Sequence, residues 1–257
     1  ILNGAEYERW SPWLDPYIPA RYGLPPEKSD ALDDDAWLQT LAGKARCKAE
    51  LQKELGLPVR PRTPLFATIS RLTDQKGIDL ICAVLESDLL QGADMQYVVL
   101  GRGDAGLEAR LKALASRYPT RLAVRVTFDE ALSHRTEAGA DFFIMPSRFE
   151  PCGLNQMYSM RYGTLPIVRT VGGLADSVVD FDARSRSGTG FTFGAYESGA
   201  LAHAIRRALR SYSGDEATFA ALVRRAMRAD FSWAQSARAY LHVYRQALRD
   251  AELRSGG

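Results

Sequence analysis

Two charged loops in this sequence carry side chains that could bind a phosphorylated ligand. In the first, Arg71 and Lys76 follow an apolar run at residues 65–69, and Gly77 comes directly after them. Two cations on one short loop could reach a single diphosphate, and a glycine gives the backbone freedom to bend there. The alternative is a solvated turn that carries two unrelated charges.

The second loop places a carboxylate beside a predicted helix start. An apolar run at 142–145 is followed by Pro146, Glu150, Pro151 and Gly153. We expect a helix to begin at Pro151 or Gly153, because proline needs no amide partner in a first turn and glycine lets a ligand approach the backbone. Free amides at a helix start attract anions, so a carboxylate there indicates a ligand with both phosphate and hydroxyl groups. The alternative is an ordinary strand, turn and helix with a capping glutamate.

A third stretch, residues 101–106, matches the glycine-rich fingerprint of dinucleotide-binding proteins. It follows a predicted strand at 96–100, and Asp129 and Glu130 lie at about the distance of a ribose-binding acid. However, the fingerprint belongs to the first strand of such a fold, and this stretch follows the second. We therefore favour a plain glycine turn and keep an NAD-dependent oxidoreductase as an alternative.

Neither metal chemistry nor a charged partner is predicted. The aspartates at 33–35, 180 and 182 do not directly follow an apolar strand, so helix capping explains them better than metal binding. The odd number of cysteines, 3, without ligand spacing favours a reducing cytosol over a disulfide framework. A net charge of +2 gives no reason to expect nucleic acid or a membrane surface, and no apolar run reaches the length of a membrane span.

Alternating strands and helices must position the charged loops. Apolar runs predict strands at 65–69, 96–100, 122–126, 142–145, 165–168 and 190–193, with helices between them at 78–90, 105–117 and 131–138. This alternation favours an α/β fold with a Rossmann-like parallel sheet and helices on both faces, whose ligands bind at the carboxyl ends of the strands.

We expect three parts along the chain. Residues 1–27 are irregular and rich in proline and aromatic residues; they either line another surface or are the stump of a linker. Residues 28–213, opening with a helix at 33–55, form the Rossmann-like domain, and 214–257 form C-terminal helices. Because the sequence starts at Ile1 without an initiator methionine, we expect it to be part of a longer protein.

Taken together, these stretches resemble bacterial glycogen synthases and plant starch synthases. The resemblance covers nearly the whole chain, in the family's order. Many related retaining transferases carry a second glutamate eight residues after the one that corresponds to Glu150. This sequence has Tyr158 at that position, and in this respect it resembles the synthase branch of the family. The motifs that carry the resemblance are ILNG at 1–4, SRLTDQKGIDL at 70–80, PSRFEPCGL at 146–154, YGTLP at 162–166, GGLADSV at 172–178 and DFSW at 230–233.

The resemblance implies one half of a GT-B fold and transfer of glucose from ADP-glucose to the non-reducing end of an α-1,4-glucan, with retention. By this resemblance, Arg71 and Lys76 bind and neutralise the leaving diphosphate. Glu150 binds the glucose hydroxyls and stabilises the positive charge on the sugar in the transition state. No metal or other cofactor is implied.

The same resemblance supplies further binding residues. Backbone amides around Cys152, Gly153 and Leu154 would hold sugar and phosphate oxygens. Phe128 stands where relatives often place an aromatic ring against adenine. Asn155 and Asn3 fall near the site by motif.

The family's N-terminal half, with its Lys-x-Gly-Gly-Leu loop and acceptor-side groups, has no counterpart in this sequence. The glucan acceptor would therefore be held by a missing half. A nucleotide-binding module without turnover stays open as an alternative. The resemblance implies a cytoplasmic protein of a bacterium, or a plastid protein of a plant.

Overall fold

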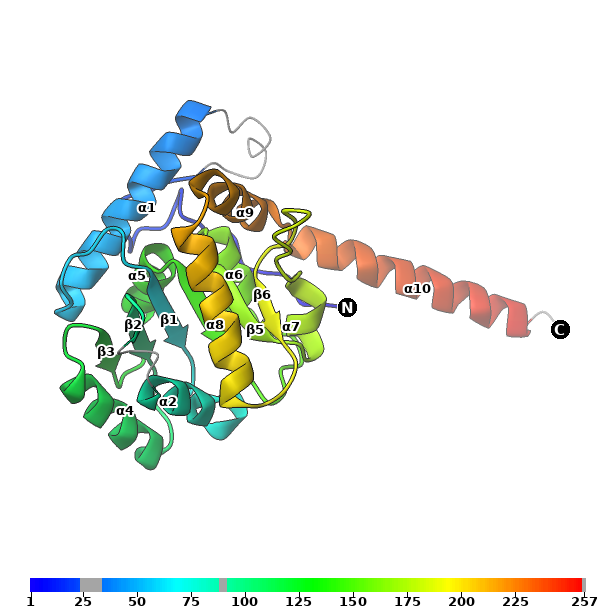
Figure 1. The fold of residues 1–257 in the computed structure, drawn as a ribbon. Coiled ribbons are helices and arrows are strands. Elements are labelled where there is room, and N and C mark those ends of the chain that lie inside the picture. The colour runs from blue at the N-terminus through cyan, green and yellow to red at the C-terminus, as the bar shows by residue number, and fades with distance from the viewer. Residues whose placement is uncertain (24–33, 88–91, 256–257) are drawn as a thin grey trace.

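The computed structural model describes residues 1–23, 34–87 and 92–255, which contain a six-stranded sheet (Figure 1). Every neighbouring pair of strands is parallel, in the order β3-β2-β1-β4-β5-β6. The predicted Rossmann-like fold is therefore confirmed. The strands are β1 (Leu65–Ile69), β2 (Gln96–Leu100), β3 (Leu122–Arg125), β4 (Phe142–Met145), β5 (Leu165–Arg169) and β6 (Phe191–Phe193).

Helices connect these strands and cover both faces of the sheet (Figure 1). A short 3-10 turn, η2 (Asp74–Lys76), lies between β1 and the next helix. The helices are α1 (Asp34–Leu55), α2 (Ile78–Glu86), α4 (Ala105–Arg117), α5 (Glu130–Gly139), α6 (Asn155–Arg161), α7 (Gly172–Ser177), α8 (Ser198–Ser213), α9 (Glu216–Arg228) and α10 (Trp233–Ser255).

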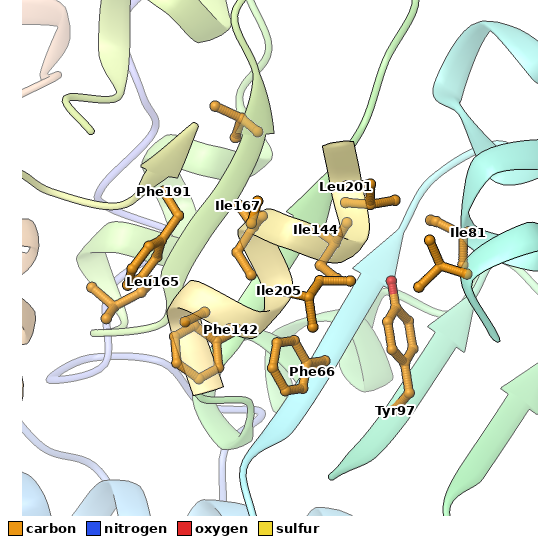
Figure 2. Packing of buried hydrophobic residues seen from close by; sticks show 14 of the residues in the cluster. Phe66, Ile81, Tyr97, Phe142, Ile144, Leu165, Ile167, Phe191, Leu201 and Ile205 are labelled. Carbon is orange, nitrogen blue, oxygen red and sulfur yellow. The ribbon is translucent and has the colours of Figure 1, made fainter. Parts of the chain in front are cut away.

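The central strands are apolar along their whole length because both faces of the sheet are buried. Phe66 and Phe142 pack with Ile205 of α8 on one face (Figure 2). The residues that follow them, Ala67 and Phe143, belong to a second apolar cluster with residues of α1 and α5. Successive side chains of a strand point to opposite faces, so one apolar run serves two cores.

The chain reverses its direction across the sheet between β1 and β4. From β1 it moves outward through β2 and β3, and it then returns to β4 on the other side of β1. The carboxyl ends of parallel strands lie at the same edge, so the loops after β1 and β4 become neighbours there. This switch point is where open α/β sheets bind their ligands.

The observed elements differ from the predicted ones at a few ends. α6 begins at Asn155, so the prediction that a helix starts at Pro151 or Gly153 was wrong. Gly153 has a φ of 71°, a left-handed conformation that cannot continue an α-helix. α2 ends at Glu86, before the predicted residue 90; residues 88–91, like 28–33 near the predicted domain boundary, lie outside the described residues.

The two terminal segments differ in how they pack against the rest of the chain. Residues 1–23 pack over α5 and α6, where the Trp10 ring stacks on His134 at 3.7 Å and the Tyr22 hydroxyl donates to the Tyr162 carbonyl at 2.9 Å. This packing supports a lining segment over a linker stump. α10 instead projects away from the sheet (Figure 1). Over the described residues, the helices all fall short of the length and apolar character that a membrane span needs.

Candidate active site

A pocket of about 180 Å³ lies at the switch point, between the loops after β1 and β4. Two larger hollows, of about 630 and 830 Å³, lie beside α8 and α9 and contain no predicted site residue. The small pocket brings together six of the nine predicted site residues: Arg71, Lys76, Glu150, Gly153, Leu154 and Asn155.

Gly77 allows the two charged loops to approach each other. Its φ is 72°, and a Cβ at this position would lie 2.2 Å from the carbonyl oxygen of Pro146, which follows β4. A side chain at position 77 would therefore separate the loops. The Arg148 amide also donates to the Gln75 carbonyl at 2.9 Å, which joins the same two loops through their backbones.

This approach places Lys76 against Glu150. The ammonium Nζ donates to Oε2 at 2.5 Å, and the two side chains are only 19% and 9% exposed. The Ser147 hydroxyl donates to the same carboxylate oxygen at 3.3 Å. Partial burial weakens the screening of this ion pair, so Glu150 is held as an oriented anion at the pocket wall. Such a carboxylate can accept hydrogen bonds from sugar hydroxyls and stabilise positive charge nearby.

Arg71 lies on the same pocket and is exposed. Arg71 and Lys76 thus line one pocket, and their binding of one diphosphate stays a prediction. Two cations with one carboxylate can bind a ligand that carries a diphosphate on one side and hydroxyl groups on the other.

The turn from Cys152 to Asn155 completes the pocket wall. The side-chain nitrogen Nε2 of Gln156 donates to the carbonyls of Cys152 and Gly153, both at 3.1 Å, and to the Ser177 hydroxyl at 3.0 Å. The Asn155 side chain donates to the Ile69 carbonyl at 2.9 Å, which ties the start of α6 to the end of β1. These bonds fix the turn that was predicted to bind anions through its amides.

A pair of glycines supports this turn from behind. The Gly173 amide donates to the Glu150 carbonyl at 3.0 Å. A Cβ on Gly173 would lie 2.1 Å from the Cys152 carbonyl oxygen, and a Cβ on Gly172 would lie 2.2 Å from that of Glu150. The start of α7 can therefore touch the Glu150 backbone only because these residues are glycines.

Three predicted site residues do not line this pocket. Cys152 is one residue away, with its carbonyl turned to Gln156. Phe128 is 72% exposed in the loop after β3, two strands from β1. Asn3 is exposed in the N-terminal segment, where Ala5 pairs with Ser232. Their roles in binding stay predictions.

The glycine-rich stretch at 101–106 serves packing. A Cβ on Gly101 would lie 1.8 Å from the Ser70 carbonyl oxygen, and one on Gly103 would lie 2.2 Å from that of Leu72. The glycines are therefore required for the close approach of this turn to the loop after β1. Asp129 caps α5 by accepting from the Leu132 amide at 2.8 Å. These contacts favour the plain glycine turn.

Ser147, which lines the pocket, and Gln156, which holds the turn beside it, are two residues of this site that sequence reasoning missed. Both lie in the 146–156 stretch, so their place in the motif was the available signal. Throughout the part of the chain that the structure describes, no three His, Cys, Asp or Glu side chains group closely enough to hold a metal ion.

Comparison with known proteins identifies the family of this chain. Residues 50–221 match the family model of the glycosyl transferases group 1. The chain is 52% identical over 245 residues to a glycogen synthase of Anaeromyxobacter sp., covering 95% of this chain and 48% of that protein. It is 46% identical to a glycogen synthase of Aeromonas salmonicida, covering 96% and 48%. The chain thus spans about half the length of the curated relatives it matches, and its resemblance to bacterial glycogen synthases is confirmed.

Among solved structures, the catalytic domain of starch synthase IV from Arabidopsis thaliana, bound to ADP and acarbose, matches with a TM-score of 0.83 and 35% identity. The match covers 97% of this chain and 49% of that one. The residues matched by the family model run from α1 into α9 and contain the whole sheet and the pocket. This chain therefore belongs to the family of group 1 glycosyl transferases.

Proposed function

We propose that this chain is the donor-binding half of a glycogen synthase. The complete enzyme would transfer glucose from ADP-glucose to the non-reducing end of an α-1,4-glucan, with retention at the anomeric carbon. The observation that carries this proposal is the grouping of Arg71, Lys76 and the buried Glu150 in one pocket. The identity to glycogen synthases and the ADP and acarbose in the Arabidopsis starch synthase support the choice of donor and acceptor.

In this mechanism, the cations and the carboxylate have separate tasks. Arg71 and Lys76 bind the diphosphate and neutralise the charge that it gains as the leaving group. Glu150 accepts hydrogen bonds from glucose hydroxyls and stabilises the positive charge that develops on the sugar ring. Groups held in place before the reaction are usually the largest source of rate enhancement. Lys76 contacts Glu150 directly, so it connects the diphosphate side with the sugar side.

The turn from Cys152 to Asn155 would bind the donor through its backbone. Amides around Cys152, Gly153 and Leu154 donate to sugar and phosphate oxygens, and Phe128 stacks on the adenine. Asn155 and Asn3 add polar contacts near the donor. The glucan acceptor would come from the other half of the enzyme, and the protein would work in the cytoplasm of a bacterium.

The proposal is tested by titrating ADP into this chain and into three single variants. Arg71→Ala and Lys76→Ala should each weaken ADP binding by about 1.5–3 kcal/mol, the scale of a charge-assisted hydrogen bond. Glu150→Ala should leave the ADP affinity almost unchanged or slightly higher, because ADP lacks the sugar and the variant removes a negative charge. Lys112→Ala, at an exposed position of α4, is the matched control and should change nothing.

The same variants in the complete enzyme separate binding from chemistry. Glu150→Ala should lower kcat for transfer from ADP-glucose by about 10²–10³, the scale for one preorganised electrostatic group. If Glu150→Ala abolished ADP binding while Arg71→Ala did not, the assigned roles would be reversed. If ADP bound to none of these proteins, the donor assignment would be wrong.

A further inference from the structure

Four polar side chains form a cluster just outside the pocket, on four different segments. Asp79 is in the first turn of α2, Arg148 is in the loop after β4, Arg169 ends β5, and Tyr196 precedes α8. We call these residues the Tyr196 cluster. The pocket lining includes none of them. They can influence a bound ligand through the loops that they hold.

Asp79 joins two of these segments. Its Oδ1 accepts a hydrogen bond from the Tyr196 hydroxyl at 2.5 Å, and its Oδ2 accepts one from the Arg148 guanidinium at 3.1 Å. The Tyr196 hydroxyl also lies 3.1 Å from the Asp74 carbonyl, at the start of the turn that carries Lys76. Burial and the bond to Asp79 raise the pKa of Tyr196 above its usual value, so the hydroxyl remains a donor at physiological pH.

The ring of Tyr196 organises the two arginines. The Arg148 guanidinium lies 4.0 Å from the ring centroid, and that of Arg169 lies 5.5 Å from it. Arg169 donates to the Gly194 carbonyl at 2.9 Å and to the Arg148 carbonyl at 2.8 Å. One tyrosine therefore connects the loop after β1, the loop after β4 and the end of β5.

These contacts hold both sides of the Lys76–Glu150 pair. Lys76 lies in the sequence between Asp74 and Asp79, and Glu150 follows Arg148 by two residues. The Arg148 and Asp79 side chains are 48% and 28% exposed. Ion pairs this exposed contribute little to the free energy of unfolding. Their effect on the geometry of the Lys76–Glu150 pair is therefore more important than their contribution to stability.

We propose that Tyr196 is a positioning residue for glucosyl transfer, which fixes the separation between Lys76 and Glu150 by clamping their two loops together. This inference rests on the proposed function, because it assigns Tyr196 to the alignment of the diphosphate side with the sugar side. ADP binding does not need the Glu150 carboxylate. Transition-state stabilisation needs the cation and the carboxylate in one geometry, and a misplacement of about 1 Å can lower a rate by about 10².

The test is Tyr196→Phe in the full-length protein that carries this sequence. The variant keeps the ring beside both arginines and removes only the hydroxyl. Tyr244→Phe, whose side chain is 61% exposed on α10 of this chain, is the matched control. We expect Tyr196→Phe to lower kcat by about 10- to 100-fold, while the KM for the donor changes less than about threefold. The melting temperature should shift by less than about 4 °C.

A double-mutant cycle tests whether Tyr196 acts through the ion pair. In a Lys76→Ala background, Tyr196→Phe should lower kcat by less than about twofold, because the pair that it positions is already gone. Equal effects in both backgrounds would overturn the inference. An unchanged kcat in Tyr196→Phe would overturn it too, as would a loss of kcat that only follows a loss of stability.

Competitive acylation of Lys76, read by mass spectrometry on the same proteins, gives a measure that does not depend on activity. Tyr196→Phe should raise the reactivity of Lys76 several-fold relative to Lys112, because the ammonium is released from Glu150; unchanged reactivity would count against the clamp. If the wild-type protein did not transfer glucose from ADP-glucose, the proposed function would fail, and the labelling would still decide whether Tyr196 holds the pair.

Discussion

Gly173→Ala should disable the site without unfolding the protein. The new Cβ would lie 2.1 Å from the Cys152 carbonyl oxygen, and real Cβ contacts stay beyond 3.0 Å, so the backbones at Cys152 and at the start of α7 must move apart by about 0.9 Å. The same movement strains the bond from the Gly173 amide to the Glu150 carbonyl, now 3.0 Å. A displacement of about 1 Å at a catalytic group can lower the rate by about 10².

The measurement is kcat for transfer from ADP-glucose in the complete enzyme, with a thermal melt of each protein. Gly199→Ala is the matched control, since a Cβ there meets no atom within 4 Å in the first turn of α8. We expect Gly173→Ala to lose about 10² in kcat and the control to keep full activity. Full activity in Gly173→Ala would refute the idea that close packing against α7 sets the position of Glu150.

Three further predictions concern the chain as a whole. The isolated chain should bind ADP but elongate no glucan, because the roughly 7–11 kcal/mol gained by holding donor and acceptor together needs both halves; robust elongation of glycogen would contradict this. Burial lowers the pKa of Lys44 from 10.5 to about 8, so the unfolded chain holds this proton more tightly than the folded chain. Stability should therefore rise with pH from about 8 to 10.5, by at most roughly 3 kcal/mol; urea melts should show that Lys44→Met flattens this rise, and parallel curves would refute it. Trp10→Ala should lower the free energy of unfolding by about 3 kcal/mol, since the ring stacks on His134 and Tyr158, at 3.7 and 4.6 Å; Leu248→Ala, at a site 65% exposed, should change it by less than about 0.5 kcal/mol.

The strands were predictable because burial on both faces of the sheet makes each strand a short apolar run in the sequence. β1, β2 and β4 have the predicted bounds, and the other strands differ by one residue at an end. In a parallel sheet covered by helices, each strand is a short apolar run with turn residues beside it. The helix start after Glu150 was mispredicted for an equally local reason. Pro151 and Gly153 fit a first turn by residue type, but Gly153 adopts a left-handed conformation, and the helix begins two residues later.

The sequence by itself determined the residue types of the site and their place at the ends of strands. It did not determine which of them meet. Lys76 and Glu150 are 74 residues apart, and their contact depends on the strand order that places β1 beside β4. Arg169 and Tyr196 carry no spacing signal toward Lys76. Gly101 and Gly103 match a nucleotide-binding turn by sequence, and only the structure shows that they pack against the backbones of Ser70 and Leu72. Local conformation follows from neighbours along the chain, whereas these contacts follow from the packing of distant segments, which only the tertiary structure decides.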